Sequence, residues 1–310
     1  MNTVFETALS GKHIVIVGGS SGMGKATAKM ATALGAKVTI ASRNTAKLQA
    51  AAGEIGSGVR IAPVDTTDGA GVSSWARGLG SVDHLVISAS SAARGAFTDL
   101  PIDDLRAMFE AKFIGPYMTA REVLPVLVKG GSITFFSGVL SRRPSAGATG
   151  LGAVNAAVEA LAKGLALELA GRARVNCISP GMVATEAYAA TPEETREAMY
   201  AQVGSSLPAG RVGEAEDIAQ AVVMAMTNGF LTGSVLDVDG GHLVRDLRLP
   251  QVQRQIGSLP KTDLFRVAVL ASSKQIMGLE AASKLGRTRA QAQPALLTFN
   301  RSAVLGKLGS

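Results

Sequence analysis

Short apolar runs alternate with longer stretches of helical periodicity along residues 10–244. The short runs are rich in β-branched residues, and most are apolar almost throughout, as is typical of strands that are covered on both faces. Strands that alternate with helices form βαβ units, and these build a parallel sheet. The pattern predicts strands at 13–17, 37–41, 59–63, 82–88, 132–137, 173–178 and 234–238.

Helical periodicity predicts helices at 22–34, 44–55, 68–79, 101–129, 148–170 and 214–228. Right-handed crossovers between the strands then give an α/β, doubly wound Rossmann fold with a seven-stranded, mostly parallel sheet flanked by helices. In such a sheet the ligand crevice lies at the carboxyl ends of the strands. Residues 184–211 form a polar insertion interrupted by helix, which is either a lid over a substrate or a plain surface excursion.

Composition narrows the class of protein. The 310 residues are 47% hydrophobic, enough for one large core. The single cysteine, Cys177, excludes a disulfide framework and a cysteine-based zinc site, and it fits a reducing cytoplasm. The three histidines have no metal-site spacing, so we expect no metal. We see no signal peptide and no apolar stretch approaching ~18 residues, so we expect a cytoplasmic protein without a membrane span.

The formal charge of +7 is unevenly distributed. Residues 245–310 carry 11 basic and 3 acidic side chains, whereas the preceding 244 residues carry 20 basic and 21 acidic ones. We therefore predict a Rossmann domain at 1–245 and a basic C-terminal extension of unknown structure at 246–310. A solvated appendage is the simpler interpretation of the extension, and binding to a specific anionic partner is the alternative. We expect no specific nucleic-acid partner.

A glycine-rich loop joins the first predicted strand to the first predicted helix. Glycines allow a tight turn and close approach of the backbone, while the helix N-terminus offers free N–H groups to a pyrophosphate. A pyrophosphate-binding loop of this kind requires a strand before it and a helix after it, and both are predicted here. The residues that we expect to bind phosphate here are Gly18, Ser20, Ser21, Gly22, Met23 and Gly24.

The end of the second predicted strand indicates which dinucleotide binds. Ser42 stands where an NAD site has an acidic residue, and Arg43 and Asn44 follow. A guanidinium suits the 2′-phosphate of NADP(H), although Arg43 is otherwise a surface arginine without a partner. At the end of the third strand, Asp65 with Thr66 either accepts from the adenine amino group or caps a helix.

The glycine-rich loop and the strand ends described above, together with three later segments, resemble the short-chain dehydrogenase/reductase family over about residues 10–244. The later pieces are Ser179-Pro180-Gly181-Met182-Val183-Ala184-Thr185 with Arg174-Val175-Asn176 before it, Gly210-Arg211-Val212-Gly213, and the segment from Thr232 to Gly241. The resemblance implies that Pro180, Gly181, Val183 and Thr185 fold over the nicotinamide. It also implies that Ser88, Ala89 and Ser90 line the cofactor crevice, and that the protein is a homodimer or homotetramer.

The catalytic positions depart from the family pattern. Where the family has Ser, Tyr, Lys and Asn, this chain has Gly138, Leu151, Asn155 and Lys112. Leu151 has no proton to give to an alkoxide formed by hydride transfer. The nearest hydroxyl is Ser137.

Two functions are favoured over a third, which is redox-neutral chemistry such as elimination or isomerisation in the same pocket. One is an NADP(H)-dependent oxidoreductase that acts on a small organic carbonyl or conjugated substrate without the usual tyrosine acid. Its candidate catalytic residues are Lys112, Ser137 and Asn155, and Asn155 can also bond the nicotinamide ribose. Lys112 would orient or polarise a substrate oxygen, unless it only extends to solvent. The alternative function is a non-catalytic NADP(H)-binding sensor or scaffold.

Overall fold

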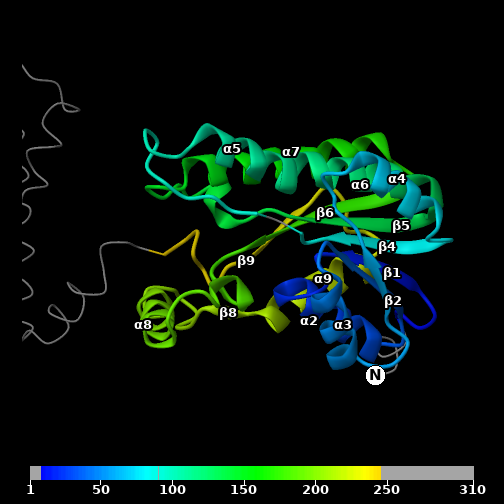
Figure 1. Cartoon of the computed structure of the whole chain (residues 1–310), viewed down its shortest axis with the longest axis horizontal. Coiled ribbons are helices and arrows are strands. Elements are labelled where there is room, and N and C mark those ends of the chain that lie inside the picture. Colours follow the sequence, from blue (N-terminus) through cyan, green and yellow to red (C-terminus); the bar gives the residue numbers. More distant parts are fainter. Residues whose placement is uncertain (1–7, 90, 246–310) are drawn as a thin grey trace, which may run out of the picture. The chain divides into compact units, whose positions relative to one another are not determined.

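A seven-stranded parallel sheet forms the centre of the computed structural model, which describes residues 8–89 and 91–245 (Figure 1). Every neighbouring pair in the order β3-β2-β1-β4-β5-β6-β9 is parallel. The doubly wound Rossmann prediction is therefore confirmed. The strands are β1 (His13–Val17), β2 (Lys37–Ser42), β3 (Arg60–Pro63), β4 (Val82–Ile87), β5 (Leu127–Phe136), β6 (Ala173–Pro180) and β9 (Val235–Val238).

Helices cover both faces of this sheet (Figure 1). On one face lie α2 (Gly22–Ala33), α3 (Thr45–Ile55) and α9 (Ala215–Thr227), and on the other lie α4 (Gly69–Arg77), α5 (Ile102–Phe109), α6 (Gly115–Val123) and α7 (Thr149–Glu168). Alternate residues of a strand point to opposite faces. Accordingly Val15 and Val17 of β1 pack in the core under α4, α6 and α7, while Ile14 and Ile16 pack in the core under α2, α3 and α9.

The helix predicted at 101–129 is confirmed over residues 102–126, but it is not one continuous α-helix and it ends before residue 127. A π-helical turn, η1 (Glu110–Ile114), separates α5 from α6, and a short 3-10 turn, η2 (Leu124–Val126), follows α6. Residues 127–129 already belong to β5. Pro125 accounts for the end of the helix, because proline lacks the N–H that would continue the hydrogen-bond ladder. The apolar residues around it fit either a helix or a strand, so periodicity did not locate the boundary.

The insertion after β6 contains helical structure, as predicted, and also short strands that its sequence did not predict. It holds η4 (Glu186–Tyr188) and α8 (Glu193–Gly204). Its two ends are joined by a short parallel ladder in which β7 (Val183–Ala184) pairs with β8 (Gly213–Glu214). Two-residue strands leave no periodic signal, so the sequence did not predict them.

Among the described residues, α7 is the one helix that is long and apolar enough to cross a membrane, with a mean hydropathy of 1.2. A core helix passes the same test. The side chains that α7 buries follow a helical stripe against β5 and β6, namely Leu151, Val154, Asn155, Val158, Glu159 and Ala162. The predicted extension at 246–310 lies outside the described residues, as does Ser90.

Candidate active site

A cleft of about 400 Å³ opens at the carboxyl ends of β1, β2 and β4. The structure brings most of the predicted cofactor residues to it, including Gly18, Ser20, Ser21, Gly22, Met23, Gly24, Ser42, Arg43, Asp65, Thr66, Ser88, Ala89 and Thr185. The remaining lining residues were not predicted: Val17, Lys47, Val64, Thr67, Ala111, Glu186 and Ala187.

The glycine-rich loop is packed too tightly for side chains. A Cβ on Gly24 would lie 2.2 Å from the carbonyl oxygen of Gly18, and one on Gly18 would lie 2.5 Å from the amide nitrogen of Ala89. Gly18 also has a φ of +86°, which favours glycine. Ser21 precedes α2 without a side-chain hydrogen bond to its first turn. The loop therefore presents bare backbone at a helix N-terminus, which is the arrangement that binds phosphate.

A carboxylate from the insertion reaches this helix N-terminus. Glu186 Oε2 accepts a hydrogen bond of 2.8 Å from the amide of Gly22, and Oε1 lies 2.9 Å from Lys25 Nζ. Lys25 also pairs with Glu54 at 2.9 Å. Partial burial disfavours the charged form of Glu186, but these hydrogen bonds outweigh that effect and lower its pKa. Glu186 thus brings a negative charge to the place where a phosphate is expected.

The end of β2 carries an unsatisfied polar atom. Ser42 Oγ is buried and has no hydrogen-bond partner among the described residues. Arg43 lines the same part of the cleft and forms no ion pair within the described chain. A hydroxyl and a guanidinium without partners suit a phosphate group. Asn44 is not at the cleft: its side chain accepts from Lys47 N and caps α3.

Asp65 lies in the cleft but is partly occupied by its own turn. Its Oδ1 accepts from the amide of Thr67 at 3.0 Å and from the Thr67 hydroxyl at 2.8 Å. The two bonds from Thr67, with a smaller effect from Arg43, lower the pKa of Asp65. The alternative that Asp65 caps the following helix is wrong, because the N-cap residue of α4 is Asp68.

Lys112 is buried rather than extended to solvent, so the solvent alternative is wrong. Only 7% of this residue is exposed, and its Nζ donates to the carbonyl of Ser137 at 3.3 Å. No carboxylate within the described chain forms an ion pair with it. Burial lowers the pKa of Lys112 from 10.5 to about 8. An amine with such a pKa exchanges its proton near neutral pH.

Ser137 takes part in a network that the sequence did not predict. Its hydroxyl donates to Glu159 Oε1 at 3.0 Å, and the Ser141 hydroxyl donates to the same oxygen at 2.6 Å. Arg142 lies 3.6 Å from this carboxylate and also pairs with Asp237. The Ser137 hydroxyl is therefore committed to holding Glu159 in place. Glu159 belongs to the buried stripe of α7. The helical periodicity of that stripe is the feature of the sequence that indicates its burial.

Asn155 and Leu151 lie on the same buried stripe of α7, in different surroundings. The Asn155 amide donates to the carbonyl of Gly138 at 3.3 Å, while its Oδ1 is buried without a partner among the described residues. Leu151 packs in an apolar cluster with Met108 and Val154. The structure thus places Asn155, Gly138 and Lys112 around the end of β5, and Leu151 packs in an apolar cluster one turn before Asn155 on α7.

The remaining predicted residues lie beside the cleft. Pro180 ends β6, Val183 begins β7, and a Cβ on Gly181 would lie 2.8 Å from Asp239 Cα. None of the three lines the cleft itself, and neither do the candidate catalytic residues Lys112, Ser137 and Asn155. Among the described residues, no group of three or more His, Cys, Asp or Glu side chains is arranged to hold a metal ion.

Comparison with known proteins places the chain in a family. The family model described as enoyl-(acyl carrier protein) reductase matches residues 17–242. A relative from Acremonium sp., short-chain dehydrogenase/reductase ucsE, is 32% identical over 79% of this chain and 100% of its own length. The chain belongs to the short-chain dehydrogenase/reductase family. It is accordingly an oxidoreductase of the type that this family comprises.

Other relatives agree with this assignment. Carbonyl reductase family member 4 of Xenopus laevis is 30% identical over 74% of this chain and 97% of its own length. A solved small-chain dehydrogenase in complex with NADPH is 39% identical, with a TM-score of 0.67, and the match covers 76% of this chain and 99% of that one. A putative betaketoacyl-ACP reductase is 31% identical, with a TM-score of 0.69 over 76% and 99% of the two chains.

Proposed function

We propose that this chain is an NADP(H)-dependent oxidoreductase that acts on a small organic carbonyl or conjugated compound without a tyrosine acid. The observation that carries the cofactor assignment is the pair formed by the unpartnered Ser42 hydroxyl and the neighbouring Arg43 in the cleft. A 2′-phosphate supplies acceptors for both groups, whereas a ribose hydroxyl leaves the guanidinium without an anion. The relative solved with NADPH supports the same choice.

The described residues fit such a cofactor. The backbone of Gly22, Met23 and Gly24 would hold the pyrophosphate, and the buried Oδ1 of Asn155 would accept a hydrogen bond from a ribose hydroxyl. When bound, NADP(H) supplies or accepts a hydride. Thr185, at the edge of the cleft, would help to orient the nicotinamide end, as the family resemblance implies.

Proton supply then falls to Lys112. Its ammonium is buried and donates to the carbonyl oxygen of Ser137, the residue before Gly138. Because its pKa is about 8, the amine is mostly protonated at pH 7 and yet releases a proton readily. General acids work best when their pKa lies near the working pH. Leu151 lends the site no proton, and the Ser137 hydroxyl is engaged by Glu159. Lys112 is therefore our candidate for the group that polarises or protonates a substrate oxygen.

The packing of Leu151 favours one alternative. Its contacts with Met108 and Val154 give an apolar wall where a proton donor is useful. A protein that binds NADP(H) as a sensor or scaffold needs no donor there. Under this alternative the protein binds NADP(H) but does not turn it over.

NADPH oxidation against a panel of aldehydes, ketones, quinones and enones distinguishes the two functions. We expect turnover on at least one class, with conjugated carbonyls favoured because their reduction demands less help from a proton donor. Absorbance at the NADPH band gives the rate, and titration of NADPH fluorescence gives the Kd. Tight binding without turnover on every class supports the sensor, and absence of NADPH binding rejects both functions.

Substitution of Glu186 by glutamine should tighten NADPH binding at least threefold. Glutamine retains an oxygen that accepts from the Gly22 amide but removes a negative charge from the expected phosphate site. Fluorescence titration at low ionic strength measures the change, and added salt should diminish it. Glu54→Gln is the matched control, since Glu54 shares Lys25 but does not line the cleft. Weaker binding of NADPH by the Glu186 variant would instead mean that the Glu186 carboxylate holds the cleft closed.

We also propose that the protein is a homo-oligomer, as is typical of its family. Exposed apolar side chains on α6 and α7 support this, with Tyr117 44% exposed and Leu167 80% exposed. Light scattering of the eluted protein measures the mass, and a monomer at micromolar concentration rejects the proposal.

A further inference from the structure

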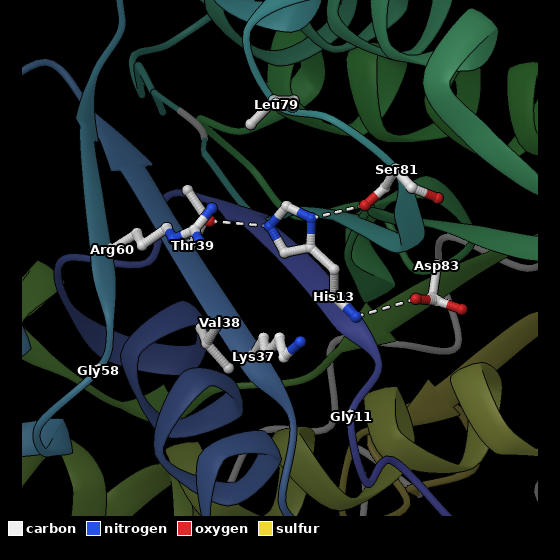
Figure 2. A pocket seen from close by; sticks show the side chains of 10 residues that line it. All are labelled: Gly11, His13, Lys37, Val38, Thr39, Gly58, Arg60, Leu79, Ser81 and Asp83. Atoms are coloured by element: carbon white, nitrogen blue, oxygen red, sulfur yellow. Dashed lines mark hydrogen bonds between the residues drawn. The ribbon is translucent and has the colours of Figure 1, made fainter.

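A second cleft lies at the opposite end of the sheet from the cofactor cleft. Its volume is about 570 Å³, and it shares no lining residue with the first cleft. It is bordered by the first residues of β1, β2 and β3 and by the turn before β4 (Figure 2). Amino ends of parallel strands do not usually bind ligands, so a polar cleft here calls for its own explanation.

The register of the strands brings four polar side chains onto one face. His13 pairs with Lys37, and Thr39 pairs with Arg60. Paired residues of neighbouring strands share a face, and so do Lys37 and Thr39, which are two residues apart. Further along this face lie the core residues Val15, Ala41 and Ala62. The four side chains are thus the polar end of a face that is otherwise apolar.

His13 fixes the shape of the cleft. Its Nδ1 lies 2.8 Å from the carbonyl oxygen of Ser81, and its Nε2 lies 2.9 Å from the hydroxyl of Thr39 (Figure 2). A carbonyl only accepts, so Nδ1 is the donor in its bond to Ser81, while Nε2 and the Thr39 hydroxyl share the second bond. These bonds connect β1 to β2 and to the turn before β4, and they hold the imidazole ring in one orientation at the side of the cleft.

The charge of the cleft is positive. Asp83 is the acidic lining residue, and it is already engaged by Lys12 at 3.0 Å and by the His13 amide at 2.9 Å. Lys37 and Arg60 have no ion-pair partner in the part of the chain that the structure describes. Arg60 is opposite Thr39, so Lys37 and Arg60 are diagonal neighbours on one face, and an anion between them would be attracted by both.

We propose that this cleft binds a small phosphorylated metabolite, with its phosphate between Lys37 and Arg60. A guanidinium binds phosphate through two parallel hydrogen bonds, and an ammonium adds a point charge. The volume lies within the range of small-molecule sites, and the polar side chains of His13, Lys37, Thr39 and Arg60 on one wall suit a ligand with a charged group. The site is separate from the reaction centre and stands whether or not the protein turns over NADPH.

Titration of the full-length protein with glycerol 3-phosphate tests the proposal, with histidine ring signals in NMR spectra as the readout. The chain has three histidines, so the His13 signal is assigned with a single His13→Gln variant. We expect a saturable shift of His13 in the millimolar range or below, with His84 and His242 unmoved. The double variant Lys37→Met/Arg60→Met should weaken binding at least tenfold.

A matched control, Arg121→Met/Lys129→Met, removes one arginine and one lysine charge outside the cleft and should retain the affinity within twofold. Sodium chloride at equal ionic strength controls for screening. The proposal is overturned if His13 does not shift, if chloride reproduces the shift, or if the Lys37/Arg60 variant binds as well as the wild type. Binding at the phosphate loop of the other cleft leaves His13 unmoved and so is not mistaken for this site.

Discussion

Replacement of Lys112 by methionine should reduce turnover at least 100-fold and leave the Kd for NADPH within threefold. The same change should raise the free energy of unfolding at pH 7 by about 2 kcal/mol. Burial lowers the pKa of Lys112 from 10.5 to about 8, and each pKa unit corresponds to about 1.4 kcal/mol. Methionine fills the space without a charge but loses the hydrogen bond to Ser137, which offsets about 1 kcal/mol of the gain.

The pH dependence of stability follows from the same shift. Between about pH 8 and 10.5 the unfolded chain holds a proton on Lys112 that the folded chain has released. Stability rises with pH wherever the unfolded state binds more protons, so this residue contributes a rise over that window. Urea unfolding of wild type and Lys112→Met at several pH values isolates the contribution as a difference. Lys163→Met, an exposed change on α7, is the control and should leave the profile unaltered.

Two results would contradict this role of Lys112. Unchanged turnover in the methionine variant would remove Lys112 from the chemistry, and a loss of stability at pH 7 would mean that the ammonium is better solvated than its burial indicates. A parallel loss of NADPH binding would assign the residue to the shape of the cleft.

Replacement of Arg43 by glutamine should weaken NADPH binding 10- to 100-fold and alter NADH binding less than threefold. In the proposed complex the Arg43 guanidinium would contact the 2′-phosphate, by which the two cofactors differ, and a charge-assisted pair with phosphate accounts for an effect of this size. Fluorescence titrations with both dinucleotides measure the ratio. Lys47→Gln is the control, because Lys47 lines the same cleft and tests the effect of general positive charge. Equal losses for both dinucleotides would mean that Arg43 supports the fold of the loop.

The sequence predicted the sheet because its information is local. Each strand is an apolar run of β-branched residues, and the glycine loop lies between one strand and one helix, so both are visible in a short window. The boundary near Pro125 was missed because the same apolar residues suit a helix and a strand.

Contacts between distant residues were beyond the sequence. Glu186 meets Gly22 across 164 positions, and Glu159 meets Ser137 across 22. The cleft around His13 depends on the pairing of β1 with β2 and of β2 with β3, and its residues look like ordinary strand starts when read singly. A single sequence does not indicate which distant residues will be in contact, because their distance in space depends on the register of the strands.

The short ladder between Val183 and Gly213 has a consequence for how this architecture diversifies. Since both ends of the intervening segment are fixed to each other, changes in its length or composition do not alter the spacing of β6 and α9. Lengthening a closed loop costs little free energy. The stretch between Ala187 and Gly204 can therefore vary in length and composition at little cost, provided that Thr185 and Glu186, which line the cofactor cleft, are retained.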